Sequence, residues 1–235
     1  MSKSGFFSQQ LVSAPVWGDR DALLLNLCAG RRVLHVGCAD SPLTAERLEK
    51  GSLLHAKLLR AASEVHGVDV DLAGVELLRD RLGGEYSVAD VADPKDRGDL
   101  VKFRPEIVLA GDVIEHVRDA ASFLRGIVTL MREAGDGVEL ILSTPNGLAA
   151  KNMINTLAGL EIIHPDHVYV FTPASLARLV SDCGLRPKQW FFYHVDSGNS
   201  PRARSYDAVS RIAAHLRPAF SEGQVLVCQS IPEGA

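Results

Sequence analysis

Residues 32–42 read RVLHVGCADSP, an apolar run from Arg32 to Gly37 followed by a tight turn that ends at Pro42. A similar run, Glu64 to Val70 (EVHGVDV), ends in aspartates. Apolar β-rich runs that alternate with helical patterns predict crossover units and a mainly parallel sheet. We therefore expect both runs to be strands. The helix between them is predicted from about Leu43 to Ala62, opened by Ser41 and Pro42 as cap and first turn.

The same alternation continues through the rest of the chain. We expect further strands at Tyr86 to Ala89, Pro105 to Ala110, Gly137 to Ser143, about Pro187 to His194 and Gly223 to Cys228. Further helices are predicted at Leu72 to Leu82, Asp119 to Arg132 and Ala174 to Cys183. Seven strands with helices on both faces predict an α/β, doubly wound, mostly parallel sheet. In such sheets ligands bind outside the carboxyl ends of the strands.

The bulk composition is that of one globular domain. The chain has 235 residues, of which 46% are hydrophobic and 23% are charged, and its net charge is −4. This charge gives no reason to expect nucleic acid as a partner. One basic stretch lies late in the chain, and we interpret it as a solvated face, with a site for an acidic or phosphorylated substrate as the alternative. Its members are Arg202, Arg204, Arg211 and Arg217.

Cysteine usage and hydropathy bear on the compartment. The four cysteines are scattered without metal-ligand spacing, which favours reduced thiols in the cytosol. No apolar run is long enough to cross a membrane, and the first ten residues lack the apolar core of a signal peptide. We expect a cytoplasmic protein.

The loop after the first strand indicates the kind of ligand. Asp69, at the end of the second strand, can accept hydrogen bonds from both hydroxyls of a ribose. The dinucleotide fingerprint G-x-G-x-x-G fails, because Ala39 and Pro42 occupy glycine positions, and no phosphate-binding G-x-x-x-x-G-K-[ST] occurs. The pattern therefore suits adenosine without a pyrophosphate.

Five segments in register then resemble a known family. HVGCADSP, VHGVDVD, VADVAD, IVLAGDVIEHV and LILSTPNG, followed by DHVYVFTPASLARLVSDCGL, are similar to the ordered motifs of class I S-adenosylmethionine-dependent methyltransferases of the ubiquinone type. His35 stands where the family usually has an acid, and Ala39 and Ser41 where it usually has glycines. The H-x-G-C-x-D-x-P-L-T variant resembles enzymes of glycan or secondary-metabolite pathways.

The resemblance implies a Rossmann-like fold with the last strand antiparallel, and a cofactor, S-adenosylmethionine, that leaves as S-adenosylhomocysteine. It also implies a division of the single domain. Residues 1–28 would form an N-terminal cap, and their position alone leads us to expect that Phe6, Phe7 and Trp17 fold over the cofactor. Residues 29–146 would form the cofactor-binding core, 147–171 a lid on the acceptor side, and 172–235 the rest of the sheet. The implied cofactor-binding residues are Gly37, Cys38, Ala39, Asp69, Val70, Asp90, Val91, Gly111 and Asp112.

Methyl transfer to an alcohol needs a base whose pKa lies near neutrality, and histidine is the natural candidate. The lid segment HPDHVYVFT carries His164 and His167, and His116 follows Glu115 after the fourth strand. His167 is our first choice, with His164, His116 and Asp112 as further catalytic candidates. Loop histidines bonded to the backbone are the alternative interpretation. For His35, His55 and His66 we expect buried structural roles.

We predict no metal site, although one alternative uses the same residues. Asp112, Glu115, His116 and His167 resemble the carboxylate and histidine set of small-RNA 2′-O-methyltransferases, which could hold a divalent ion. The leading hypothesis is O-methylation of a small polar acceptor such as a sugar hydroxyl or a secondary metabolite. An N-methyltransferase, a metal-dependent RNA 2′-O-methyltransferase and a non-catalytic cofactor-binding module remain alternatives.

Overall fold

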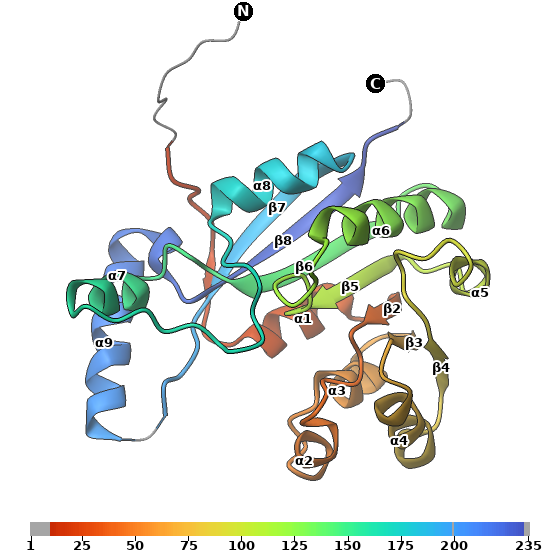
Figure 1. Cartoon of the computed structure of the whole chain (residues 1–235), viewed down its shortest axis with the longest axis horizontal. Coiled ribbons are helices and arrows are strands. Elements are labelled where there is room, and N and C mark those ends of the chain that lie inside the picture. Colours follow the sequence, from red (N-terminus) through yellow and green to blue (C-terminus); the bar gives the residue numbers. More distant parts are fainter. Residues whose placement is uncertain (1–9, 199, 233–235) are drawn as a thin grey trace, which may run out of the picture.

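A computed structural model describes residues 10–198 and 200–232 and contains a single eight-stranded sheet (Figure 1). Its spatial order is β4-β3-β2-β5-β6-β8-β7-β1. The strands are β1 (Val16–Trp17), β2 (Arg32–Val36), β3 (Glu64–Asp69), β4 (Glu85–Val88), β5 (Ile107–Gly111), β6 (Glu139–Pro145), β7 (Leu185–Tyr193) and β8 (Gly223–Ser230). All seven predicted strands are present. The eighth, β1, has two residues and pairs in parallel with the end of β7.

Only β8 runs against its neighbours, pairing antiparallel with both β6 and β7. The doubly wound arrangement with an antiparallel last strand is therefore confirmed. The strand order reverses between β2 and β5, because β3 and β4 extend the sheet on one side and β6 on the other. This switch point is where open α/β sheets bind their ligands.

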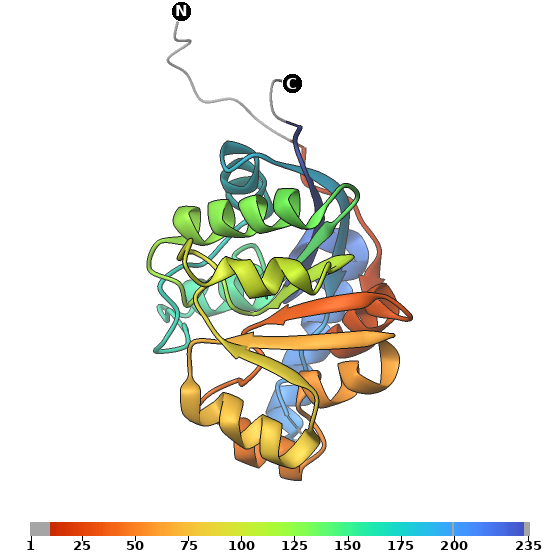
Figure 2. The ribbon, with the colours of Figure 1, turned by 90° about the vertical axis from the view of Figure 1, so that its right-hand side faces the viewer.

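Helices cover both faces of the sheet (Figure 2). The helices α1 (Arg20–Cys28) and α3 (Leu54–Ala61) pack on one face with Leu23, Leu24 and Leu58 fully buried. On the other face the apolar sides of α6 (Ala120–Ala134) and α8 (Pro173–Asp182) join the larger core cluster. The remaining helices are α2 (Thr44–Glu49), α4 (Leu72–Leu82), α5 (Arg97–Lys102), α7 (Ala150–Leu157), α9 (Pro201–Leu216) and the short 3-10 turn η1 (Pro218–Phe220).

The predicted helix from Leu43 to Ala62 is wrong in one respect, because it is two helices. The chain turns at Gly51, whose φ of +64° favours glycine, and Ser52 and Leu53 both donate to the carbonyl of Arg47. Ser41 and Pro42 do not cap the first helix, which begins at Thr44 without a side-chain cap. Thr44 instead donates its hydroxyl to the carbonyl of Ala39, which ties the helix to the loop before it.

None of the helices in the described part of the chain combines the length and the apolar character that a bilayer-spanning segment needs.

Candidate active site

The loop after β2 has one position that only glycine fits. Gly37 has a φ of +76°, and a Cβ added there would lie 2.4 Å from Cγ2 of Val113. The amide groups of Gly37 and Cys38 both donate to the carbonyl of Val68, at 2.8 and 3.2 Å. Asp40 also has a positive φ, +56°, and forms an ion pair with Arg47 at 2.7 Å. The loop backbone is thus fixed against β3 and α2.

Asp69, at the end of β3, joins this loop to the next one. Its Oδ2 accepts from the amide of Ala39 at 2.9 Å, and its Oδ1 accepts from the amide of Asp71 at 3.0 Å. A carboxylate oxygen has two acceptor sites, so each oxygen keeps one for a further donor. The neighbouring Val70 is 70% exposed. An oriented carboxylate beside an exposed apolar side chain suits a ribose followed by a flat base.

The two predicted residues that follow β4, Asp90 and Val91, differ in how far their side chains are exposed. Asp90 is exposed, and its carboxylate accepts from the amide of Ala92 at 2.8 Å. The side chain of Val91 is buried in the main core, and a Cβ at Gly126 would meet the Val91 carbonyl at 2.3 Å. Of Val91, only the main chain is therefore placed for contact with a cofactor.

Asp112, directly after β5, lies in a polar network with Arg20. Its φ is +53°, and its carboxylate accepts from Nη1 of Arg20, from Oγ of Ser143 at 2.7 Å and from the hydroxyl of Tyr193 at 3.3 Å. Burial opposes the charge on Arg20, but the nearby carboxylate of Asp112 raises the pKa of Arg20 above its ordinary value. Burial, followed by Asp112, raises the pKa of Tyr193 as well. Asp112 therefore already has three donors.

Three of the predicted residues, all histidines, lie close together beside Glu115, which follows β5. The rings of His116 and His167 lie 4.7 Å apart and those of His164 and His167 lie 5.0 Å apart. The lid is held there by its backbone, because the amides of Val168 and Tyr169 donate to the Glu115 carbonyl at 2.8 and 3.2 Å. One ligand atom from each of Glu115, His116 and His167 lies within 4.8 Å of the other two. We call Glu115, His116, His164 and His167 the histidine cluster.

The protonation of this cluster follows from its surroundings. Glu115 is 1% exposed, and neither carboxyl oxygen has a hydrogen-bond partner among the described residues. Burial, and then repulsion from Asp112, raises the pKa of Glu115 to about 8. Burial, and then His116 and His164, lowers the pKa of His167 below its usual value, which favours the neutral imidazole. The Nδ1 of His116 lies 3.2 Å from the carbonyl of Asp166, so it donates and leaves Nε2 as an acceptor.

Sequence comparisons add the decisive observation. A family model described as a methyltransferase domain matches residues 17–189. The chain belongs to this methyltransferase family. The ubiquinone biosynthesis O-methyltransferase of Aeromonas salmonicida (strain A449) is 29% identical over 166 residues, which cover 66% of this chain and 63% of that protein. The chain thus spans less than two thirds of that relative's length.

Solved structures show the same fold at low sequence identity. A putative methyltransferase from Bacillus halodurans C-125 aligns with a TM-score of 0.57 at 12% identity, over 90% of this chain and 99% of that one. The N-methyltransferase NodS from Bradyrhizobium japonicum WM9, solved with S-adenosyl-L-homocysteine, aligns with a TM-score of 0.51 at 12% identity, over 89% and 85%. The family match thus identifies the chain as a methyltransferase domain, and the solved structures show that it shares their fold.

In the methyltransferase, Gly37 directly follows β2 and Asp69 ends β3, so both lie at the carboxyl ends of neighbouring parallel strands, and β2 borders the switch point of the sheet. The sequence interpretation missed Arg20. The role of residues 1–28 was predicted from their position alone, and Arg20 follows none of the predicted strands. A basic residue just after the helix cap Asp19 was the only available signal.

Other singled-out residues have structural roles. His35, His55 and His66 are buried as predicted, and Nδ1 of His35 lies 3.0 Å from Nδ1 of His55. Burial, and then His55, lowers the pKa of His35, so this pair stays neutral. Asn146, after β6, is 1% exposed; its side-chain amide donates to the carbonyls of Ala219 and Ser221, and its Oδ1 accepts from the amide of Leu148 at 3.0 Å, so it has a structural role in the turn. Trp17 lies in β1 at the sheet edge, while Phe6 and Phe7 fall outside the described residues.

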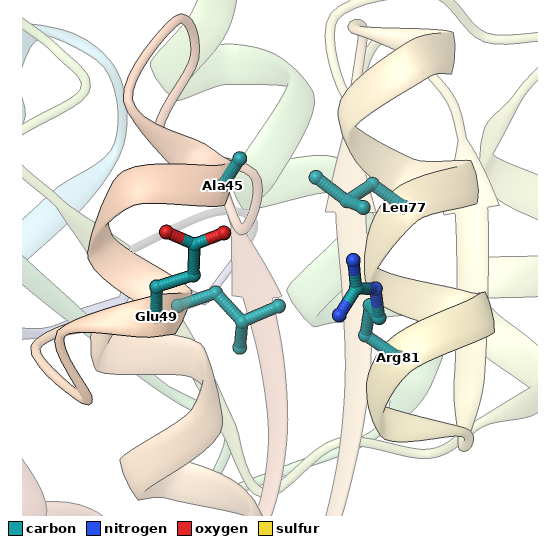
Figure 3. Close-up of a pocket in the computed structure, with 5 residues that line it drawn as sticks. Ala45, Glu49, Leu77 and Arg81 are labelled. Carbon is teal, nitrogen blue, oxygen red and sulfur yellow. The ribbon is translucent and has the colours of Figure 1, made fainter.

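One surface groove holds none of the predicted residues. It lies between α2 and α4, has a volume of about 200 Å³ and is lined by Ala45, Leu48, Glu49, Leu77 and Arg81 (Figure 3). Glu49 on α2 and Arg81 on α4 stand on opposite sides of the groove. The groove is therefore peripheral to the strand-end site.

Proposed function

We propose that the methyltransferase methylates a hydroxyl group of a small polar acceptor, such as a sugar or a secondary metabolite, with His167 as general base. The observation that carries this proposal is the position of His167 in the histidine cluster, on the segment 147–171. A half-buried imidazole with a lowered pKa is neutral near pH 7 and can take a proton. We infer that segment 147–171 covers the acceptor.

S-adenosylmethionine, when bound, would supply a methyl group on a sulfonium sulfur for in-line displacement, with S-adenosylhomocysteine as the product. In our proposal the Asp69 carboxylate binds the ribose hydroxyls, and the Gly37 loop gives the backbone room for the ligand. Arg20 lies at the same strand ends, where its Nε and Nη2 donate to Oδ1 of Asp21 and its Nη1 donates to Asp112, so that it holds Asp112 in place. These residues hold the reacting groups in place, and positioning supplies much of the acceleration in such displacements.

Substitution of His167 tests the assignment. His167→Gln should lower turnover by about a hundredfold or more, since general bases contribute on this scale, while cofactor affinity stays unchanged. Turnover is measured as S-adenosylhomocysteine formation with an acceptor found in a screen that begins with sugars. The matched control is Glu161→Gln, at an exposed position on the same segment, which should retain most of the activity. Undiminished turnover in His167→Gln would exclude it as the base and favour an amine acceptor.

A metal-dependent reaction is the second candidate, and the unpartnered carboxyl of Glu115 favours it. A buried acid without hydrogen-bond partners is costly, and a divalent ion between Glu115, His116 and His167 would supply the missing partner. Asp112, by contrast, is engaged by Arg20. Such an ion could polarise an acceptor hydroxyl.

Chelation separates the two candidates. Metal-free protein is titrated with Mn²⁺, and turnover is measured before and after treatment with a chelator. Micromolar binding that is lost in Glu115→Gln, together with chelator-sensitive turnover, would establish the metal-dependent reaction. Full turnover in the chelated protein would leave His167 as a metal-free base.

We place the methyltransferase in the cytoplasm. The support is that all four cysteines, Cys28, Cys38, Cys183 and Cys228, are buried free thiols, as is usual in a reducing compartment.

A further inference from the structure

A second cavity lies away from the histidine cluster, where the N-terminal segment, the end of β7 and α9 meet. Its volume is about 340 Å³, within the range of small-molecule sites. It is lined by Ala14, Val16, Trp17, Gly18, His194, Arg211, Ala214, His215 and Pro218. Three of these side chains carry basic nitrogens, one is a large aromatic ring, and none is acidic. We call it the β1–α9 cavity.

His194 is held in one orientation by a buried acid behind it. Its Nδ1 lies 2.9 Å from Oε2 of Glu222, whose side chain is 8% exposed. Burial opposes the ionisation of Glu222, but hydrogen bonds from His194 and Ser210, with the charge of Lys151, lower its pKa to about 2. An ionised carboxylate only accepts, so Nδ1 of His194 donates, and Nε2 has no partner in the described part of the chain.

The basic helix contributes the other two nitrogen-bearing groups. Arg211 is paired through Nη2 with Asp196 at 2.9 Å, which leaves its other N–H groups available. His215, one turn later, has no hydrogen bond or ion pair within residues 10–198 and 200–232. The charged groups around His194 are therefore Glu222, Lys151 and Asp207 behind it, and Arg211, His215 and Asp196 around the cavity.

We propose that the β1–α9 cavity binds a small molecule with an oxyanion, a carboxylate, sulfate or phosphate, attached to an apolar or aromatic body. The oxyanion would lie between His194, Arg211 and His215, and the body against Trp17. In the imidazolium form of His194 both ring nitrogens donate, so Nε2 can donate to the oxyanion while Nδ1 donates to Glu222. The imidazolium then bridges Glu222 and the ligand. In this proposal, Arg211 of the basic stretch serves the alternative interpretation given above, in which that stretch forms a site for an acidic or phosphorylated substrate.

The site is linked to the strand-end network by two short connections. Tyr193, the residue before His194, donates to Asp112, and Gly18 lies two residues before Arg20, which also donates to Asp112. An oxyanion bound here is the acidic group of the acceptor itself or that of a separate small molecule. Both sources require the same chemistry of recognition.

Calorimetric titration of the full chain with benzoate at pH 6 tests the proposal. Benzoate should bind, and benzyl alcohol, the neutral counterpart, should bind far more weakly. Equal binding of the alcohol, or no binding of benzoate at ~10 mM and pH 6, would each overturn the proposal.

Variants locate the binding. Arg211→Gln, at an exposed position that leaves the fold intact, and His194→Gln should each weaken benzoate binding tenfold or more. The matched control is Arg204→Gln, an exposed arginine on the same helix that does not line the cavity. An equal loss in Arg204→Gln would show only general attraction to the basic helix and would refute the site.

Kinetics then identify the source of the oxyanion. Benzoate that raises the KM of the acceptor with kcat unchanged shows that the acceptor carries the group. Benzoate that changes kcat without competing shows that a separate molecule does. This last comparison rests on the proposed function, whereas the binding measurements need no turnover and stand or fall independently of it.

Discussion

The cofactor side of the strand-end edge and the acceptor side are built in different ways. On the cofactor side, Gly37 and Asp69 are fixed by the backbone of neighbouring strands and lie over an apolar core. On the acceptor side, α7 buries only Ala150, and its attachment is polar. Nζ of Lys151 reaches the carbonyl of Val195 at 2.8 Å, Ser197 at 2.7 Å and Asp207 at 3.1 Å.

The difference corresponds to what each side must do. A cofactor of fixed shape is served by main-chain geometry, which tolerates few side-chain changes. An acceptor must enter and leave, and elements with few buried apolar contacts open at a lower free-energy cost. Large apolar side chains on the acceptor side are exposed, with Leu157 at 90% and Ile162 at 65%. We infer that the acceptor side can rearrange without disturbing the cofactor side.

Removing Lys151 should have the largest effect on stability. Lys151→Met leaves Asp207 and Glu222 without their cation, and breaking such a buried cluster costs about 3–5 kcal/mol of unfolding free energy. The matched control is Lys102→Met, whose partner Asp99 is exposed, and which should leave stability nearly unchanged. Both are measured by denaturant unfolding. A stable Lys151→Met would mean that packing, rather than charge, holds α7.

The same cluster predicts a sensitivity to acid. The folded-state pKa of Glu222 and that of Asp207 are both lowered to about 2. A carboxylate whose pKa is lower in the folded than in the unfolded state stabilises the folded state at pH values above its unfolded-state pKa. This stabilisation is lost as the pH falls towards 2. Wild type should therefore lose stability between about pH 4.5 and pH 2 more steeply than Lys151→Met. Parallel curves for the two proteins would contradict the assignment.

On the cofactor side, Gly37→Ala should have the next largest effect. The positive φ costs about 1–2 kcal/mol for any residue with a Cβ, and overlap with Val113 adds to this. Gly30→Ala is the control, because Gly30 has a φ of +67° but no heavy atom within 4 Å of an added Cβ. The two variants should share the loss from φ, and only Gly37→Ala should also weaken cofactor binding. Equal affinities in both variants would remove Gly37 from the cofactor site.

The two sides also differ in how far the sequence predicts them. The seven main strands were all predicted because each is a short apolar or β-rich run bounded by turn residues. The helix predicted from Ala174 to Cys183 corresponds to α8, whose start the structure shows to be capped by Thr172. The helix from Leu43 was predicted as one because Gly51 is a single weak interruption. The strand β1 was missed because two residues at an edge carry no periodicity.

The site residues also differ in how far the sequence predicts them, depending on whether strand topology or tertiary packing places them. Gly37 and Asp69 end predicted strands, so topology alone brings them to one edge. Arg20 meets Asp112 across 92 residues of sequence, and its contact depends on how α1 packs on the sheet. The attachment of α7 through Lys151 likewise depends on tertiary contacts with residues 195–222. Spacing in a single sequence does not encode contacts of this kind.

The smallest expected effect is the sharpest test of the cofactor side, because it compares two neighbouring aspartates. Asp69→Asn keeps the side-chain shape but replaces one acceptor oxygen with a donor group that faces a backbone N–H. Cofactor affinity should fall about tenfold to a hundredfold, which corresponds to the value of hydrogen bonds to a charged group.

The control variant, Asp71→Asn, should leave affinity and stability nearly unchanged, since asparagine caps a helix as well as aspartate does. Calorimetric titration with S-adenosylhomocysteine measures both. If Asp71→Asn lost the affinity instead, the ribose acid would be Asp71, and the bonds from Ala39 and Asp71 to Asp69 would serve only to shape the loop.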